Sequence, residues 1–228
     1  MTAQLPPGQR EAVAFHRFGL TQFATRFPKE TSTCTLEIAG RVSNELRLVD
    51  PLNGLPRTEQ RCDFHCVTTW SFRALRWEGV RFIDFYDKVL LPLASPAADA
   101  TLVSFKGQDG ARTAMMLEDL LSPDVLLADR LNGEPLSVDH GAPLRLVAPA
   151  HYGYKSAKHL CSLEFREPRE GYRVSGFRFM DHPRARVALE ERGRVIPGWL
   201  LRYLYRPLIP GTVARFARAS KERNSDEK

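Results

Sequence analysis

The chain has 228 residues, 43% of them hydrophobic and 10% aromatic, which excludes a disordered polypeptide and provides for one sizeable core. No apolar run approaches the roughly 18 residues that a membrane-spanning helix needs, and four cysteines are too few for a disulfide scaffold. The net charge of +6 is concentrated in residues 181–228, with 11 basic and 6 acidic side chains, so the near-neutral remainder is not expected to bind nucleic acid.

The first part of the chain is expected to contain an entry segment, two strands and a helix. Residues 1–30 lack a clean periodicity and are interpreted as an extended segment that lies across the core. Apolar and polar residues alternate over 34–38, which predicts a strand, and residues 64–67 predict a short buried strand. Between 82 and 90 apolar residues recur at helical spacing, and Pro92 is expected to end that helix.

The middle of the chain favours strands. Strands are predicted over 101–105, 125–131, 135–136, 144–147 and 160–165. Asn132-Gly133 is typical of a hairpin turn, and residues 115–121 predict a short helix or turn. Many strands with few helices predict an α+β fold.

The composition divides the chain into a main domain, residues 1–190, and a basic aromatic C-terminal extension, residues 191–228. Pro207 and Pro210 are expected to limit helices in the extension to short pieces, and the residues from Ser220 onward are expected to fray.

The mixture of aromatic residues and arginines in the extension is typical of an interaction surface. A protein partner or peripheral contact with an anionic membrane would suit it. The alternative is that its apolar residues pack on the core and its arginines face water.

Residues 1–19 contain neither a basic stretch followed by an apolar one nor a twin-arginine pair. We therefore expect no signal peptide and a cytoplasmic protein. Reduced cysteines in that compartment are suited to serve as thiolate ligands.

A first motif, Asp-Phe-His-Cys-Val-Thr-Thr-Trp-Ser at 63–71, places one thiol beside small hydroxyls and an aromatic ring. A soft, polarisable metal prefers thiolate ligands, so Cys66 is a candidate metal ligand. Without its neighbours, Cys66 would be interpreted as a buried structural cysteine.

Two further interpretations of Cys66 stay open. It could be a nucleophile with His140 or His65 as its base. It could also belong to a zinc site with a ligand set drawn from Cys62, His65, Cys66, His159 and Cys161, although their spacing matches no familiar closed tetrahedral site.

A second motif, residues 140–158, combines a histidine, an arginine and a Gly-x-Lys-Ser-x-Lys run. Ammonium groups, hydroxyls and backbone N–H groups suit a phosphate dianion. Arg145 lies inside the apolar run 144–147, where an arginine needs a buried partner, either an anionic cofactor or Asp139.

The two motifs, in this order, resemble the molybdopterin-binding core of the sulfite oxidase family. The closer resemblance is to its small haem-free branch, which includes the catalytic subunit of methionine-sulfoxide reductase, and it covers roughly residues 35–166. It implies a fold of curved mixed sheets with flanking helices and a molybdenum–molybdopterin cofactor.

The resemblance also implies roles for individual residues. Cys66 would ligate molybdenum, and Arg17, in a segment that loosely matches the family, would act beside it. The implied cofactor-binding residues are Thr68, His140, Arg145, Lys155, Ser156, Ala157 and Lys158. Two positions differ from the family: Ser71 stands where sulfite oxidases carry an arginine for sulfite, and Thr68 stands where the reductase branch carries a glutamate.

The activity that the resemblance implies is oxygen-atom transfer, coupled to two-electron chemistry, on a small sulfur oxyanion, sulfoxide or N-oxide. Electrons would leave or arrive through a separate partner, because the sequence shows no haem, flavin or iron–sulfur motif. The alternative is a non-catalytic binding or scaffold protein that keeps the fold.

Overall fold

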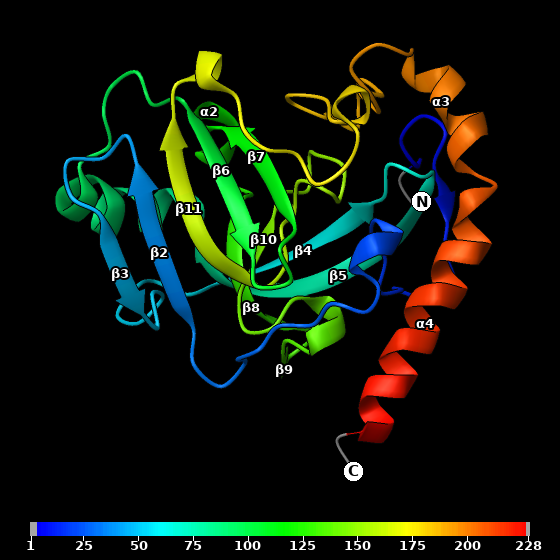
Figure 1. Cartoon of the computed structure of the whole chain (residues 1–228), viewed down its shortest axis with the longest axis horizontal. Helices are drawn as coiled ribbons and strands as arrows, with labels where there is room; N and C mark the ends of the chain where they lie inside the picture. The colour runs from blue at the N-terminus through cyan, green and yellow to red at the C-terminus, as the bar shows by residue number, and fades with distance from the viewer. Residues whose placement is uncertain (1–3, 227–228) are drawn as a thin grey trace.

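Two β-sheets dominate the computed structural model, which describes residues 4–226 (Figure 1). Sheet A has the order β1-β5-β8-β10, with β4 also paired to β5 and β9 to β8. Its strands are β1 (Arg10–Glu11), β4 (Thr58–His65), β5 (Trp70–Arg81), β8 (Leu126–Leu131), β9 (Glu134–Pro135) and β10 (Arg145–Val147). Within it, only β1 runs parallel to its neighbour among the described strands.

Sheet B has the order β3-β2-β11-β6-β7, in which β2 and β11 are parallel and the other pairs antiparallel. Its strands are β2 (Thr35–Gly40), β3 (Leu46–Val49), β6 (Leu102–Gly107), β7 (Arg112–Met116) and β11 (Leu160–Arg166). Both sheets therefore mix long-range pairings with local hairpins.

Helices are short except at the C-terminus. The α-helices are α1 (Phe82–Phe85), α2 (Leu117–Leu120), α3 (Gly198–Tyr205) and α4 (Leu208–Asp226), and η2 (Tyr86–Ala94) is a π-helix. Short 3₁₀ turns are η1 (Thr21–Phe23), η3 (Val138–His140), η4 (Pro168–Glu170) and η5 (Arg178–Met180). No helix in residues 4–226 combines the length and apolarity needed to cross a membrane.

The main core lies between the two sheets. Leu36 and Ile38 of β2 are buried while Glu37 between them is exposed, as the alternation of a half-buried strand requires. They meet Val80 of β5 and Leu127 of β8 in one cluster. Each such side chain contributes about 2 kcal/mol when it leaves water, so this cluster fixes the frame on which the loops are held.

Most of the predicted strands are confirmed, at 35–40, 102–107, 126–131, 145–147 and 160–166. The hairpin around Asn132-Gly133 and the short helix within 115–121 are also confirmed. β5 and β7 were not predicted. In β5 the left-handed Ala74 (φ 58°) and a bulge between β4 and β5 change the phase of burial, so no simple alternation runs through the strand.

The expectation that Pro92 ends its helix is wrong. η2 continues to Ala94 and ends at the left-handed Ser95, whose N–H donates to the carbonyl of Leu90 at 3.1 Å. Pro92 has no N–H group to donate to the helix, but the hydrogen bond from Ser95 to Leu90 closes the last π-helical turn around it.

The expectation of only short helical pieces in the extension is also wrong. α3 ends at Tyr205, before Pro207, as predicted for a proline stop. α4 then runs for 19 residues through Asp226, because Pro210 falls in its first turn, where backbone N–H groups have no helical acceptor to lose. The residues from Ser220 to Asp226 are helical rather than frayed; Glu227 and Lys228 lie outside the described residues.

Candidate active site

A cavity of about 340 Å³ opens where the β4–β5 hairpin, the 140–158 loops and the start of the chain meet. We call it the cysteine cavity. It is lined by six of the predicted site residues: Cys66, Thr68, His140, Arg145, Ser156 and Lys158. The structure thus brings together two motifs that lie about 75 to 90 residues apart in the sequence.

Cys66 lies in the tight turn of the β4–β5 hairpin. The Cys66 N–H donates to the carbonyl of Trp70 at 2.8 Å, and the N–H of Thr69 donates back to Cys66 at 3.1 Å. Thr69 has φ 84°, which lets the chain reverse within these residues. The thiol is 8% exposed and its Sγ lies 3.2 Å from Oγ1 of Thr68. Burial raises the pKa of the Cys66 thiol, so a thiolate there calls for a metal or another strong partner.

The cysteine hairpin is held in place by two residues distant in sequence. Gln9 donates its side-chain amide to the carbonyl of Cys66 at 3.1 Å. Arg192 is fully buried and donates to the carbonyl of Val67 at 2.6 Å, while its Nε lies 3.1 Å from a carboxylate oxygen of Glu190. The hairpin turn therefore cannot shift without breaking buried charge-assisted hydrogen bonds.

Arg145, which is buried, and Lys158, which is partly buried, supply positive charge to the cavity. Arg145 donates to the carbonyl of His140 at 2.8 Å and its guanidinium lies 4.6 Å from the ring centroid of Trp77. Gly141, with φ 114°, lies between the two cations, and a Cβ there would come within 3.0 Å of Arg145 and 3.2 Å of Lys158. The alternative partner proposed for Arg145, Asp139, is not its ion-pair partner among the described side chains.

The pKa values of these groups are lowered. Burial lowers the pKa of Lys158 to about 7, assisted by the nearby Arg145 and Arg17, and burial lowers that of Arg145 to about 9. Burial, with Arg145 and Lys158 beside it, lowers the pKa of His140 to about 4. The cavity therefore carries positive charge that its own carboxylates do not balance, and His140 is neutral at pH 7.

The remaining cavity residues provide polar contacts at its wall. The His140 ring stacks on Phe15 with centroids 4.6 Å apart. The hydroxyl of Ser156 accepts a hydrogen bond from the N–H of Ala148 at 3.2 Å. The N–H of Ala157 donates to the carbonyl of Lys155 at 2.9 Å, so this backbone group is engaged within its own loop.

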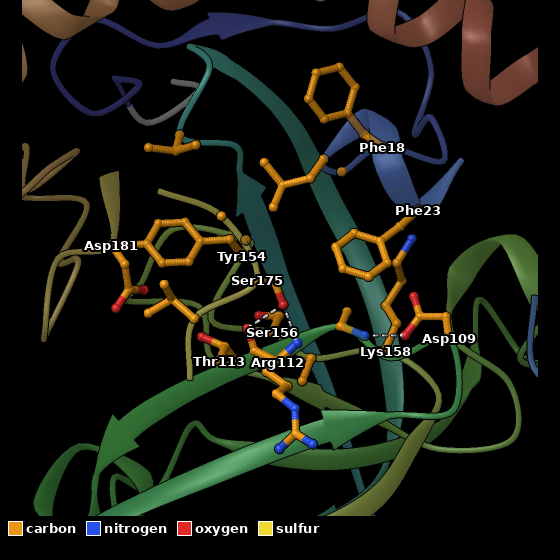
Figure 2. A pocket seen from close by; sticks show the side chains of 18 of the residues that line it. Phe18, Phe23, Asp109, Arg112, Thr113, Tyr154, Ser156, Lys158, Ser175 and Asp181 are labelled. Atoms are coloured by element: carbon orange, nitrogen blue, oxygen red, sulfur yellow. Dashed lines mark hydrogen bonds between the residues drawn. The ribbon is translucent and has the colours of Figure 1, made fainter. Parts of the chain in front are cut away.

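A neighbouring cavity of about 200 Å³ adjoins the cysteine cavity and shares Tyr154, Ser156 and Lys158 with it. Figure 2 shows its interior, with Phe18 at the top, Tyr154 on the left, and Phe23 on the right above Lys158 and Asp109. The wall is mainly apolar, so this space suits an uncharged group.

Arg17 lies in the neighbouring cavity and away from Cys66. Its guanidinium donates to the carbonyl of Ala24 at 2.8 Å, and its Nε lies 3.7 Å from Asp139. It stacks against Phe27 at 4.2 Å. These contacts tie the start of the chain to the core, and they place Arg17 near Lys158 rather than near the thiol.

Lys155 is not brought to either cavity. Its side chain is fully buried, its Nζ donates to the carbonyl of Ala114 at 2.8 Å, and Asp181 lies 3.5 Å away. Burial lowers its pKa to about 8, against the opposing effect of Asp181. Lys155 therefore links β7 to the 181 segment, while the neighbouring Lys158 points to the cavity.

The comparison with protein families decides the class of this site. The profile of the family described as "Oxidoreductase molybdopterin binding domain" matches residues 24–172. The chain belongs to this family. The oxidoreductase class and the molybdenum–molybdopterin cofactor predicted from the two motifs are confirmed.

Several known proteins are similar to parts of this molybdopterin oxidoreductase. An uncharacterised oxidoreductase, YuiH, of Bacillus subtilis is 32% identical over 183 residues, covering 77% of this chain and 89% of the relative. The methionine-sulfoxide reductase catalytic subunit MsrP of Gluconobacter oxydans is 33% identical over 64% of this chain and 52% of its own length. Mitochondrial sulfite oxidase of Macaca fascicularis is 33% identical over 64% of this chain, but only 26% of its own length is covered.

The fold prediction is also confirmed. The sulfane dehydrogenase SoxCD of Paracoccus pantotrophus superimposes with a TM-score of 0.51 at 24% identity, covering 58% of this chain and 38% of that one. The chain thus spans nearly all of YuiH but about half of MsrP. The division into residues 1–190 and 191–228 stays a prediction.

The cysteine cavity suits the molybdopterin cofactor of the family. Among the described side chains, neither Arg145, which is 2% exposed, nor the partly buried Lys158 forms an ion pair. Buried charges without counter-ions are unfavourable. An anionic phosphate would satisfy them, and Cys66 is the soft ligand in the same cavity.

The other interpretations of Cys66 find less support. The described residues contain no group of three or more His, Cys, Asp or Glu placed to hold a metal, which disfavours the zinc site. The Nδ1 of His65 lies 2.8 Å from the hydroxyl of Ser71, and the His140 ring lies on Phe15. Neither histidine is placed as a hydrogen-bonded base for the thiol.

Arg192 and Gln9 are site residues that sequence reasoning missed. Both contact the cysteine hairpin through its backbone, and a backbone contact needs no particular side chain on the hairpin. Arg192 lies in a Glu-Glu-Arg-Gly-Arg run that is typical of a solvated surface. The local sequence therefore gives no sign that Arg192 is buried, because its burial comes from tertiary contacts with residues distant in sequence, Val67 and Pro7.

Replacing Arg192 by methionine is expected to lower the free energy of unfolding by about 3 kcal/mol, because the carbonyls of Val67 and Pro7 lose their donor. Thermal denaturation measures this as a fall in Tm of about 9 °C. Arg194→Met, two residues along and exposed, is the control and should change the stability by less than about 0.5 kcal/mol. Equal Tm values for the two variants would contradict the role of Arg192 in holding the cysteine hairpin in place.

Proposed function

We propose that Cys66 ligates the molybdenum of the cofactor and that the enzyme transfers an oxygen atom to or from a small, uncharged sulfur or nitrogen oxide. The observation that carries the first part is the position of Cys66 in a cavity wall that also holds the basic side chains Arg145 and Lys158. The cofactor, when bound, supplies two-electron chemistry and accepts or gives up the oxygen atom.

The residues of the chain would bind the cofactor and orient the thiol of Cys66. Arg145 and Lys158 attract the anionic part of the cofactor, and the hydroxyls of Thr68 and Ser156 face the same space. The fixed turn around Cys66 sets the direction of the thiol, because the hairpin is held through backbone carbonyls. His140, neutral at pH 7, can accept or donate a hydrogen bond at the cavity wall without adding charge.

An uncharged substrate is favoured because the cysteine hairpin offers no cation for a sulfite anion. Ser71, at the position of the sulfite-binding arginine in the resemblance, is buried and donates to Gln9 at 2.9 Å. Arg73 is occupied by Glu11 at 3.0 Å and by Asp63. The cavity wall also includes apolar and aromatic side chains, among them Val67, Tyr154, Met180 and Tyr205.

We further propose that electrons arrive from a separate partner. One relative is named as a catalytic subunit and another as a putative reductase subunit, which indicates that such enzymes work in assemblies. No nucleic acid enters this function, because the domain that carries the site is nearly neutral.

The test is metal analysis followed by a substrate panel with an artificial electron mediator. We expect molybdenum in the purified protein and reduction of methionine sulfoxide, dimethyl sulfoxide or trimethylamine N-oxide by a reduced viologen dye. The kcat/KM for the best neutral oxide should exceed that for sulfite oxidation by at least about tenfold, since the cofactor would engage Arg145 and Lys158 and the described cavity wall holds no further lysine or arginine for an anionic substrate. Faster sulfite oxidation would refute the substrate class, and a metal-free, inactive protein would support the scaffold alternative.

A further inference from the structure

The outer face of α3 is an exposed apolar stripe. Trp199, Leu200, Tyr203 and Leu204 recur at the spacing of one helical face and are 59%, 41%, 60% and 56% exposed. The opposite face of the same helix is buried through Leu201 at 1% exposure and Tyr205 at 5%, so α3 is firmly packed on the protein. The stripe is therefore a stable surface feature and not a loosely placed end.

The stripe continues beyond α3. Leu208, at the start of α4, is 53% exposed, and Val195, just before α3, is 75% exposed. Figure 1 shows α3 and α4 along one outer side of the molecule, away from the strands of sheet B. An apolar stripe of this kind, on a projecting helix rather than in a groove, is unusual for a surface that faces only water.

The sequence of the stripe and its flanks is rich in basic residues. The segment 192–221 contains seven arginine or lysine residues and no aspartate or glutamate; Arg192 is buried, and Arg192 and Arg202 both pair with Glu190, so the surface charge comes from the other five. Arg194 and Arg215 are exposed, and Arg218 is exposed and paired with Glu222 at 2.8 Å. The surface that carries the stripe is thus complementary to a negatively charged partner.

We infer that the outer face of α3 docks on the surface of an anionic lipid bilayer. A projecting helix with tryptophan and tyrosine on its apolar face and arginines around it has the composition of an interfacial membrane-binding helix. A bilayer needs no matching groove, whereas a protein partner would have to supply one for four large side chains on a convex face. The arginines would attract the lipid head groups, and Trp199 and Leu204 would enter the interface.

The inner face of α3 connects this surface to the cysteine hairpin. Arg202 lies 2.6 Å from Glu190, which also pairs with Arg192, the residue that holds the hairpin. Arg206, directly after α3, donates to the hydroxyl of Thr69 at 3.4 Å. Docking through α3 would therefore place the active site close to the membrane, where a membrane-held electron donor can reach it.

Trp199 provides a direct test in the full-length protein. Of the three tryptophans, Trp70 and Trp77 are 5% and 1% exposed and Trp199 is 59% exposed. Vesicles of phosphatidylcholine mixed with phosphatidylglycerol should shift the tryptophan emission to the blue and protect it from iodide, and Trp199→Phe should abolish the shift. Flotation should show binding at least about tenfold tighter than to phosphatidylcholine alone, and weaker binding at high salt.

Two variants test the docking face: Leu204→Asp removes an apolar group and adds a negative charge, and Arg215→Gln removes only a positive charge. Leu204→Asp should weaken binding to the mixed vesicles about tenfold, whereas Val49→Asp, on the exposed edge strand β3 and 62% exposed, should leave it unchanged. Arg215→Gln should weaken it about fivefold. All three variants should keep wild-type activity with a small-molecule mediator, which shows that they fold.

Three results would overturn the inference. Equal binding to neutral and anionic vesicles would remove the electrostatic argument. An unchanged Trp199 emission in vesicle-bound protein would show that another surface is in contact. Loss of a protein partner or of self-association in Leu204→Asp, with no vesicle binding by the wild type, would assign the stripe to a protein interface instead.

Discussion

Serine in place of Cys66 is expected to lower kcat at least about 100-fold while the protein keeps its fold. Serine fills nearly the same volume and can keep the contact with Thr68, so the hairpin should remain intact. A hydroxyl is a harder and far less acidic ligand than a thiol, and it would not replace a thiolate on a soft metal. The measurement is turnover of the best neutral oxide with a reduced mediator, together with the molybdenum content.

Cys161→Ser is the matched control. Cys161 is half-buried on β11, its Sγ donates to the carbonyl of Lys106 at 3.4 Å, and it lines neither cavity. A serine hydroxyl can make the same hydrogen bond, so activity should stay within about twofold of wild type. Full activity of Cys66→Ser with an intact molybdenum centre would rule out ligation by Cys66.

The site was predictable from sequence where side-chain chemistry defines it. Cys66, His140, Arg145 and Lys158 belong to short motifs, and the residue types themselves indicate a soft metal and a phosphate. The structure brings these residues to one cavity because the β4–β5 hairpin turn and the loops around β10 open onto the same space. The combination of the two motifs therefore predicted that Cys66 and the 140–158 residues lie close together, which hydrophobic periodicity alone does not show.

Lys155 and Lys158 show where sequence reasoning stops. Both lie in the Gly-x-Lys-Ser-x-Lys run, yet Lys158 lines the cavities while the buried Lys155 reaches Ala114 of β7 and Asp181. Three residues of separation in an irregular loop do not fix the direction of a side chain. The difference comes from tertiary packing against β7, a strand that was itself not predicted.

The strand β5 was not predicted from the sequence for a related reason. Its first residues bury Trp70 and Ser71 and its later ones bury Leu75 and Trp77, with the left-handed Ala74 between them. A bulge of this kind cannot be read from alternation, since it breaks the period on which the reading depends. The same irregularity allows one strand to serve both the cysteine hairpin and the central core.

Replacing Lys158 by methionine is expected to have opposite effects on the cofactor and on the cofactor-free protein. Retention of molybdopterin should fall at least about tenfold, because the phosphate loses one charge-assisted partner. The cofactor-free protein should become more stable, by about 2 kcal/mol at pH 7, because a buried ammonium beside Arg145 is replaced by an apolar chain of similar length. Pterin content after gel filtration and the Tm of the cofactor-free protein measure the two effects.

The pH dependence distinguishes this relief of charge from a simple packing gain. Burial lowers the pKa of Lys158 from 10.5 in the unfolded chain to about 7 in the folded protein. Below pH 7 both states are protonated and the full cost of the buried charge is present. Between pH 7 and 10.5 the unfolded chain binds more protons, so the stability of wild type rises with pH through this group. The advantage of Lys158→Met should therefore be largest below pH 7 and shrink towards pH 10.5.

Lys106→Met, at an exposed position on β6, is the control and should show neither the gain in stability nor the loss of pterin. A Lys158→Met protein that is less stable than wild type at pH 6 would show that Lys158 is satisfied without the cofactor, and the case for an anion in the cysteine cavity would fail.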